Sequence, residues 1–301
     1  MTAPDGKARS VLRLVLPKGS LERATLELFA AADLAVQRGS DVDYRGTIDD
    51  PRIAEVRILR PQEIPVYVAE GIFDLGITGR DWIEETGAEV ASLGQLRYSK
   101  ATSSPIRVVL AVEGSSPWRA PGDLPEGVRV STEYPSITAR YLAEHGVKAD
   151  VRLSHGATEA KIPEIADAVV EITETGRAIR AAGLRVVATI LESYTELVAN
   201  PSTVADPARA HAMRQILTLL QGALEARGKV LVKLNVGEDQ LEDVIAVLPS
   251  MRSPTVAKLF GGGGYALETV VPKSAINVLI PELKDRGATD ILELPLQKIV
   301  H

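Results

Sequence analysis

The side chains that could do chemistry are concentrated in the segment 167–177. A short β-branched apolar run there predicts a buried strand, which ends in two carboxylates, two hydroxyls, a glycine and an arginine. A strand that turns through small residues into a helix offers free backbone N–H groups to a phosphate. Glu171, just before that turn, is a poor phosphate ligand but a good acceptor for ribose hydroxyl groups. The combination predicts a site for a sugar phosphate that is held at both ends.

The turn itself would hold the phosphate. Its backbone N–H groups and two hydroxyls would donate to the phosphate oxygens, and Arg177 would supply the counter-charge. The residues of this predicted phosphate loop are Thr173, Glu174, Thr175, Gly176 and Arg177. The alternative is an ordinary strand-to-helix turn with a solvated acid and a helix N-cap, because short Thr-Gly motifs often occur without a ligand.

Three basic residues also follow predicted strands. Lys18 stands in a turn after the strand 12–16, where the positive end of a helix dipole would add to its charge. Arg60 ends another predicted strand, and Arg80 follows the strand 75–77. Ligands of open α/β sheets bind at the carboxyl ends of the strands, so these side chains could meet phosphates there. The alternative for each of them is a solvated cation.

Gly79 and Asp81 flank Arg80 in the same turn, and the predicted substrate site includes all three. Asp81 would either bind a substrate hydroxyl or cap the helix that begins here. The four histidines show no metal-ligand spacing, so the sequence leaves the ligands of any metal unknown.

The composition excludes several classes of protein. The 301 residues are 45% apolar and 25% charged, which is ordinary for a globular chain of two or three domains. Cysteine is absent, so the chain has no disulfide, thiolate metal site or cysteine nucleophile. The net charge of −6 argues against a nucleic-acid partner. Because the sequence has neither a secretory h-region nor an apolar run of membrane length, we expect a cytoplasmic protein without a membrane partner.

The elements that must position these residues alternate along most of the chain. Strands followed by helices from residue 12 to about residue 200 predict mostly parallel sheets. The last seventy or so residues form a separate unit, in which strand and helix periods follow in the order βαββαβ. That order is ferredoxin-like.

Four segments together are more specific than any one of them, namely 14–19, 59–65, 74–81 and 167–180. In this order and spacing the chain resembles the ATP phosphoribosyltransferases, the first enzymes of histidine biosynthesis. The resemblance covers nearly the whole chain from Leu12 onward. It implies an α/β fold of two periplasmic-binding-protein-like lobes (type II) and a C-terminal ferredoxin-like regulatory domain, as in the long form of the family. The implied domains are residues 1–103 with 187–224 (lobe I), 104–186 (lobe II) and 225–301 (regulatory domain).

The resemblance also implies a reaction. ATP and phosphoribosyl pyrophosphate would give phosphoribosyl-ATP and pyrophosphate, with Mg²⁺ held mainly by the substrate phosphates. Glu171 would hold the ribose hydroxyls, and the phosphate loop would hold the 5′-phosphate. Lys18, Arg60 and Arg80 would face the pyrophosphate and triphosphate, so that Lys18, Arg60 and Glu171 act in catalysis. Two positions depart from the family. Ala178 stands where the family usually has threonine, and Ser20 stands where the family often has arginine.

The regulatory domain would bind L-histidine as a feedback inhibitor. Its implied contacts are Asn235, Ser253, Thr255 and Ala288. The chain would form a homo-oligomer, a dimer or hexamer, and histidine would favour a closed, inactive hexamer.

Two other functions remain open at this point. A small-molecule-binding protein or an effector domain can have the same two-lobed fold, but the chain lacks both an export signal and a helix-turn-helix. A prephenate dehydratase would combine similar lobes with a ferredoxin-like tail, but its chemistry needs no phosphate loop. The segment 171–177 therefore favours the transferase.

Overall fold

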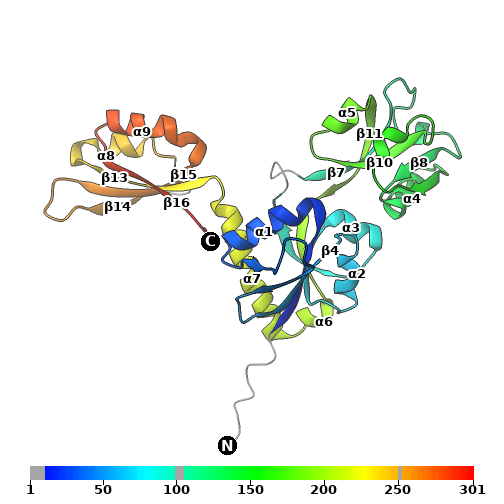
Figure 1. Cartoon of the computed structure of the whole chain (residues 1–301). Helices are drawn as coiled ribbons and strands as arrows, with labels where there is room; N and C mark the ends of the chain where they lie inside the picture. The colour runs from blue at the N-terminus through cyan, green and yellow to red at the C-terminus, as the bar shows by residue number, and fades with distance from the viewer. Residues whose placement is uncertain (1–10, 99–104, 250–252) are drawn as a thin grey trace, which may run out of the picture. The chain divides into compact units, whose positions relative to one another are not determined.

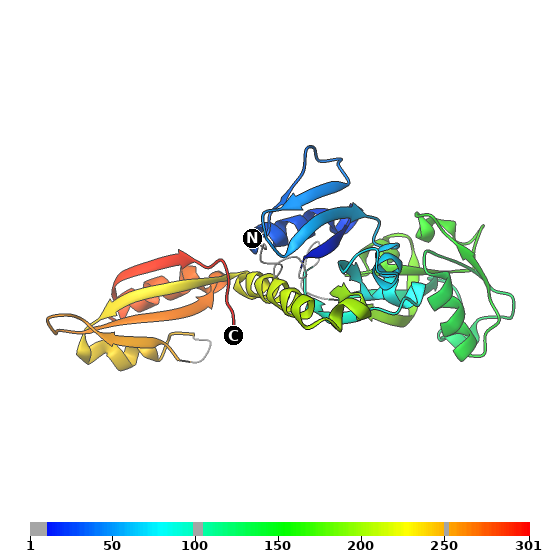
Figure 2. The same ribbon diagram turned by 90° about the horizontal axis from the view of Figure 1, so that it is seen from below.

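The computed structural model describes residues 11–98, 105–249 and 253–301. The chain divides into two compact units, Met1–Leu217 and Thr218–His301. The boundary falls within helix α7 (Pro207–Ala226), which Figure 2 shows as one continuous helix that leads into strand β13.

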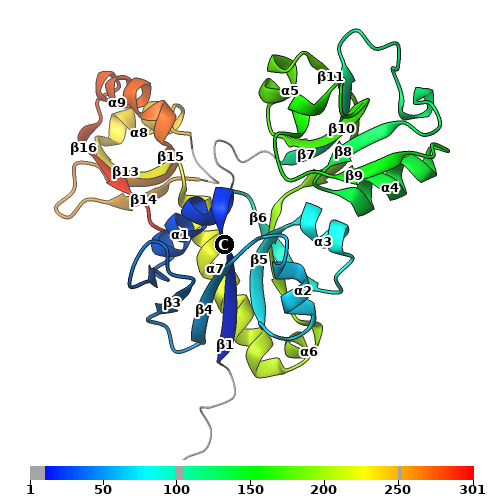
Figure 3. The ribbon, with the colours of Figure 1, turned by 45° about the vertical axis from the view of Figure 1, so that its right-hand side comes forward.

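The first lobe of the first unit is built on a seven-stranded sheet with the order β2-β3-β4-β1-β5-β12-β6. Strands β4, β1 and β5 run parallel at its centre (Figure 3). Strand β12 runs antiparallel to β5 and β6. The central strands are buried because helices cover both of their faces, which explains their continuous apolar sequences. The strands are β1 (Leu12–Pro17), β2 (Val36–Gln37), β3 (Arg45–Ile48), β4 (Ile53–Leu59), β5 (Leu75–Gly79), β6 (Ala91–Leu96) and β12 (Thr195–Ala199).

Short helices follow the central strands of this lobe. A 3-10 turn, η1 (Gly19–Leu21), joins β1 to α1, and Ser20 lies within it. Helix α3 starts directly where β5 ends, so the residues at that junction lie at the carboxyl edge of the sheet. The helices are α1 (Glu22–Ala31), α2 (Ile64–Ala69), α3 (Arg80–Thr86) and α6 (Pro201–Val204).

The second lobe of the same unit has a five-stranded sheet with the order β11-β7-β10-β8-β9. Helix α4 (Pro135–Glu144) packs on one face through Ile137 and Leu142, and helix α5 (Arg177–Ala181) packs on the other through Ile179. The strands are β7 (Ile106–Glu113), β8 (Arg129–Thr132), β9 (Asp150–Leu153), β10 (Ala168–Thr173) and β11 (Leu184–Ser193).

The expected parallel pairing is found in part of each of these two sheets, and antiparallel strands complete them. Strands β10, β8 and β9 are parallel, whereas β7 runs antiparallel to both β10 and β11. The whole of β11 pairs with β7 as far as Ser193, so the chain joins the seven-stranded sheet again at β12. The residue ranges of the three domains remain a prediction.

The second unit has the predicted βαββαβ order in a ferredoxin-like arrangement. Its antiparallel sheet has the order β14-β15-β13-β16, and α8 and α9 both cover one face (Figure 1). The strands are β13 (Lys229–Val236), β14 (Thr255–Lys258), β15 (Tyr265–Pro272) and β16 (Thr289–Pro295), and the helices are α8 (Leu241–Ile245) and α9 (Ile276–Asp285). Among the described residues, no helix has the length and apolar character needed to cross a membrane.

Candidate functional site

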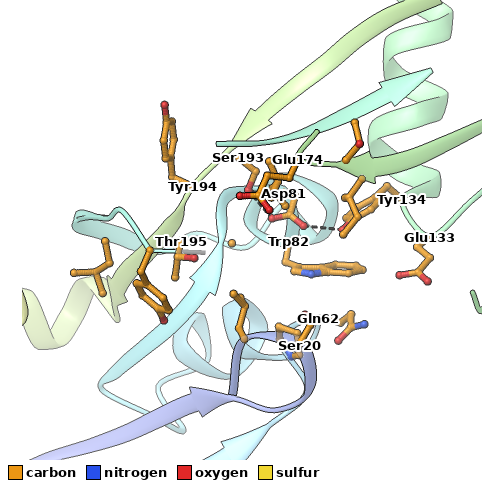
Figure 4. A pocket seen from close by; sticks show the side chains of 18 of the residues that line it. Ser20, Gln62, Asp81, Trp82, Glu133, Tyr134, Glu174, Ser193, Tyr194 and Thr195 are labelled. Carbon is orange, nitrogen blue, oxygen red and sulfur yellow. Dashed lines mark hydrogen bonds between the residues drawn. The ribbon is translucent and has the colours of Figure 1, made fainter. Parts of the chain in front are cut away.

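A cavity of about 290 Å³ lies in the first unit, and both lobes contribute to its wall (Figure 4). The first lobe provides the junction of β5 with α3, and the second provides the ends of β8 and β10. The crossing from β11 to β12 completes it with Ser193, Tyr194 and Thr195. These segments are strand ends, as expected for a ligand site in open α/β sheets.

Asp81 joins three of these segments. Its side chain is buried, and its Oδ2 accepts a hydrogen bond of 2.7 Å from the Tyr134 hydroxyl, drawn as a dashed line in Figure 4. Its Oδ1 accepts a bond of 2.6 Å from the Ser193 hydroxyl, whose oxygen in turn accepts the Asp81 backbone N–H. Burial, followed by the charge of Asp81, raises the pKa of Tyr134, so the phenol stays protonated as a donor.

Gly79 is required at this site for space. A Cβ atom on Gly79 would lie 2.1 Å from Asp81 Oδ1, far inside contact distance. The backbone at Gly79 is extended, so any residue could adopt its φ angle. The glycine therefore permits the close approach of the Asp81 carboxylate to its own strand end.

The rest of the wall is largely apolar and partly aromatic. Trp82 packs on Tyr134 with ring centroids 4.6 Å apart, and Leu21, Tyr98 and Ile172 add apolar surface. Such a pocket suits a planar ring held by stacking and oriented by a few polar groups. The sequence reasoning missed Trp82, Tyr134 and Ser193. For Trp82 the signal was its place directly after the Gly-Arg-Asp turn, in a chain with few aromatic residues.

The predicted phosphate loop meets the cavity at its first two residues, Thr173 and Glu174. Thr173 Oγ1 accepts a hydrogen bond of 2.7 Å from the Gly176 N–H, so that N–H already has a partner within the loop. Arg180 donates to the Thr175 carbonyl at 2.9 Å, and Arg177 is exposed at the start of α5. Ala178, which departs from the family, is also exposed there. The turn is thus held in shape by its own contacts.

Glu171 lies on the other face of β10 from Ile172, outside the cavity wall. Burial raises the pKa of Glu171, opposed by a hydrogen bond from the Ile172 N–H and one from the Thr158 side chain. Thr158 and Ser154 are both buried and hydrogen-bond to each other at 2.8 Å, and Ser154 accepts from the Lys161 ammonium. This chain of hydrogen bonds orients the Glu171 carboxylate.

The three basic candidates surround the cavity without lining it. The Lys18 ammonium lies 3.8 Å from the centre of the Tyr44 ring, and Arg80 forms an ion pair of 2.6 Å with Glu84. The Arg60 guanidinium lies close to Gly19, 3.9 Å from where a Cβ atom would stand. The structure therefore brings Gly79, Asp81, Thr173 and Glu174 together in one wall and places the following candidates around it: Lys18, Arg60, Arg80, Glu171, Thr175, Gly176 and Arg177.

The candidate regulatory residues fall into two places in the second unit. Asn235 on β13 donates to Asp290 at 2.9 Å, and Ala288 lies just before β16, the neighbouring strand. Ala288 is buried in the core, so only its backbone could face a ligand. Thr255 begins β14, and Ser253 lies two residues before it. Strand β14 is two strands from β13, which is about 10 Å at the usual strand spacing.

In the described parts of the chain, no three histidine or acidic side chains form a group that could hold a metal ion.

Comparisons with known proteins agree with this architecture. The family model for ATP phosphoribosyltransferase matches residues 60–222, and the model for the HisG C-terminal domain matches residues 226–298. An ATP phosphoribosyltransferase from Pelotomaculum thermopropionicum is 45% identical over 291 residues, which are 96% of this chain and 99% of the relative. One from Chlorobium phaeovibrioides is 47% identical over 292 residues, with 96% and 98% covered.

A solved structure is also similar to this chain. The ATP phosphoribosyl transferase (HisG:HisZ) complex from Thermotoga maritima has a chain that is 26% identical, with a TM-score of 0.60. The match covers 70% of this chain and 97% of that chain. With both family models matched in order and the relatives aligned almost end to end, the chain belongs to the ATP phosphoribosyltransferase family, in the long form that carries the C-terminal regulatory domain.

Proposed function

We propose that the cavity of the first unit is where ATP and phosphoribosyl pyrophosphate react. Adenine N1 attacks C1 of the ribose, the bond from C1 to the pyrophosphate oxygen breaks, and pyrophosphate leaves with the electron pair. The observation that carries this placement is the meeting of the phosphate loop with the β5–α3 junction in one cavity wall. An aromatic, mostly apolar wall beside a phosphate loop suits a base next to a sugar phosphate.

The chain's own residues would act mainly by positioning. The phosphate loop holds the 5′-phosphate, and Glu171 accepts from the ribose hydroxyls after a small rearrangement of the loop. Lys18, Arg60 and Arg80 turn from their present contacts toward the pyrophosphate and the triphosphate. Because adenine N1 is itself the nucleophile, the site needs orientation and charge stabilisation more than a general base.

Mg²⁺ enters this proposal as part of the substrates. Phosphate oxygens are ligands that Mg²⁺ prefers, and the ion commonly reaches an active site bound to them. There it neutralises charge on the departing pyrophosphate.

Regulation and assembly complete the proposal. L-Histidine binds the second unit at Asn235, Ser253, Thr255 and the backbone at Ala288, and inhibits the enzyme from there, within a homo-oligomer. The enzyme would work in the cytoplasm, where ATP is supplied.

The proposal is tested by assaying the purified protein with both substrates and Mg²⁺. We expect phosphoribosyl-ATP to form, as measured by its absorbance and confirmed by mass spectrometry, and L-histidine to suppress its formation. Omission of either substrate is the control. Folded protein that forms no product under these conditions would contradict the proposal.

Replacing Arg177 by alanine should weaken binding of phosphoribosyl pyrophosphate. A charge-assisted contact to a phosphate is lost, so its KM should rise about ten- to a hundredfold, with a smaller effect on the KM for ATP. Steady-state kinetics with each substrate varied in turn would measure this. Arg119→Ala, which removes an exposed arginine from the same lobe, is the matched control. Equal and unchanged KM values in both variants would remove Arg177 from the phosphate site.

A further inference from the structure

Helix α3 of the first lobe caps helix α4 of the second. Tyr134, the N-cap residue of α4, makes no side-chain capping bond. Glu85 of α3 supplies the cap instead: its Oε1 accepts from the Ser136 N–H and its Oε2 from the Ile137 N–H, both at 2.9 Å. The first N–H groups of a helix lack partners within the helix, and a negative charge is favourable beside them. The carboxylate of one lobe therefore satisfies the helix end of the other.

Other contacts between the two helices lie around this cap. Asp81 and Trp82 of α3 both contact Tyr134, as described above. Glu84 lies 3.5 Å from Arg140, but both side chains are partly exposed, so this pair is worth little. Glu85 alone makes two charge-assisted bonds to backbone groups, which are fixed by the helix and cannot rotate away.

The contact between α3 and α4 also affects the width of the cavity. Asp81 and Trp82 on α3 and Tyr134 at the start of α4 all belong to its wall, whereas Glu85 lies outside it. The separation of the two helices therefore sets the width of the cavity, and Glu85 can influence the site without touching a ligand.

We propose that Glu85 is a positioning residue that holds the two lobes closed over the cavity by capping α4 from α3. Without this cap, the lobes spend a larger fraction of time apart. A ligand that needs the closed arrangement then binds more weakly by the inverse of the closed fraction. Each substrate meets the same loss when it binds to the free enzyme, because both need the same closed wall. At saturation the substrates restore closure, so turnover itself is spared.

The first test compares Glu85→Ala with the wild type. The dissociation constants of ATP and of phosphoribosyl pyrophosphate from the free enzyme should rise by the same factor, about tenfold, while kcat stays within about twofold. The constants of Glu85→Gln should lie between those of the wild type and those of Glu85→Ala. The amide oxygen of glutamine can accept one backbone N–H, while its NH₂ group faces the other. Glu89→Gln removes the same charge from an exposed position four residues on and should leave all three constants unchanged.

A second test does not depend on turnover. The chain has two tryptophans, so Trp118→Phe leaves Trp82, which packs on Tyr134 across the contact, as the only one. In this background Glu85→Ala should shift the emission of Trp82 to longer wavelength, and both substrates together should shift it back. Separate measurement of thermal unfolding shows that each variant is folded.

The outcomes divide clearly. Equal rises in both dissociation constants with a red-shifted Trp82 emission support the cap as the closing contact. A rise in only one dissociation constant, a fall in kcat with both constants unchanged, or a Trp82 emission that does not change in Glu85→Ala would each overturn it. Failure of the reaction in the wild type would instead contradict the proposed function. The fluorescence of Trp82 would still test the cap from Glu85 independently.

Discussion

Replacing Gly79 by alanine is expected to lower kcat/KM at least about a hundredfold while the fold survives. The new methyl group would stand 2.1 Å from Asp81 Oδ1 and 3.4 Å from Ser193 Oγ. Rotation of the Asp81 side chain would relieve this clash at the lowest energy, but it breaks the hydrogen bonds of Asp81 to Ser193 and Tyr134. Displacement of a site group by about 1 Å can cost about a hundredfold in rate. Steady-state kinetics, with thermal unfolding to verify the fold, would measure the effect.

The route of this effect can be tested with a double-mutant cycle. If Gly79→Ala acts by displacing Asp81, then adding it to Asp81→Asn should cost little more than Asp81→Asn alone. Gly122→Ala is the control, because a Cβ atom there meets nothing within 4 Å and its φ angle is not in the left-handed region. Additive losses in the cycle, or a Gly79→Ala enzyme as active as the control, would contradict the role assigned to this close approach.

The sequence was informative wherever burial imposes a local pattern. Strands β1, β5 and β10 are apolar runs. The predicted strands 12–16 and 75–77 match β1 and β5 within about two residues at either end, the usual uncertainty, and β10 lies in the segment 167–177. Strands β2, β3 and β6 were missed, because they lie toward the sheet edges and are partly exposed, so their sequences carry no clear apolar period.

Residue type alone does not fix where a helix starts. Helix α4 begins at Pro135, which suits the first helical position because its missing N–H needs no partner there. Serine is a common N-cap residue, but Ser20 lies inside the 3-10 turn η1, and neither η1 nor α1 has a side-chain cap. Residue type thus suggests candidates for the N-cap position, whereas tertiary structure determines which residue stands there.

The sequence could predict the cavity wall only where the wall is local in sequence. Gly79 and Asp81 stand two residues apart and were found together by their turn. Tyr134 and Ser193 are 53 and 112 residues away from Asp81, and only the packing of the two lobes brings them to its carboxylate. The cap from Glu85 to Ser136 spans 51 residues for the same reason. Hydrophobic period and secondary-structure propensity depend on neighbours within one element, so they cannot predict contacts between lobes.

Glu171→Gln should lower activity and at the same time stabilise the fold at neutral pH. The pKa of Glu171 is raised, mainly by burial, which disfavours the carboxylate in the folded protein. Glutamine keeps an oxygen that can accept from the Ile172 N–H and from Thr158, but it carries no charge to bury. It also loses the charge that would strengthen hydrogen bonds from ribose hydroxyls, so kcat/KM should fall about ten- to a hundredfold.

The pH dependence of these two effects follows from the direction of the shift. A group whose pKa is higher in the folded than in the unfolded state favours folding when protonated, and this contribution is lost as the pH rises through the folded value. The Glu171→Gln variant should therefore unfold at a higher temperature than the wild type at pH 7. The difference should close as the pH falls below the ordinary glutamate value of about 4.3. Thermal unfolding over a pH series, with exposed Glu89→Gln as the control, would measure it.

The hydrogen-bond partners of Glu171 affect its pKa, and they therefore give a test that is based on activity. Thr158→Val removes the side-chain donor to Glu171 without changing its volume greatly, so the raised pKa should rise further. The acid limb of the kcat/KM profile for phosphoribosyl pyrophosphate should then move to higher pH, whereas Glu171→Gln should have no such limb from this group. A limb that stays in place in Glu171→Gln would assign it to another residue. A limb that moves as expected would identify the buried carboxylate as the group that must be charged for the sugar to bind.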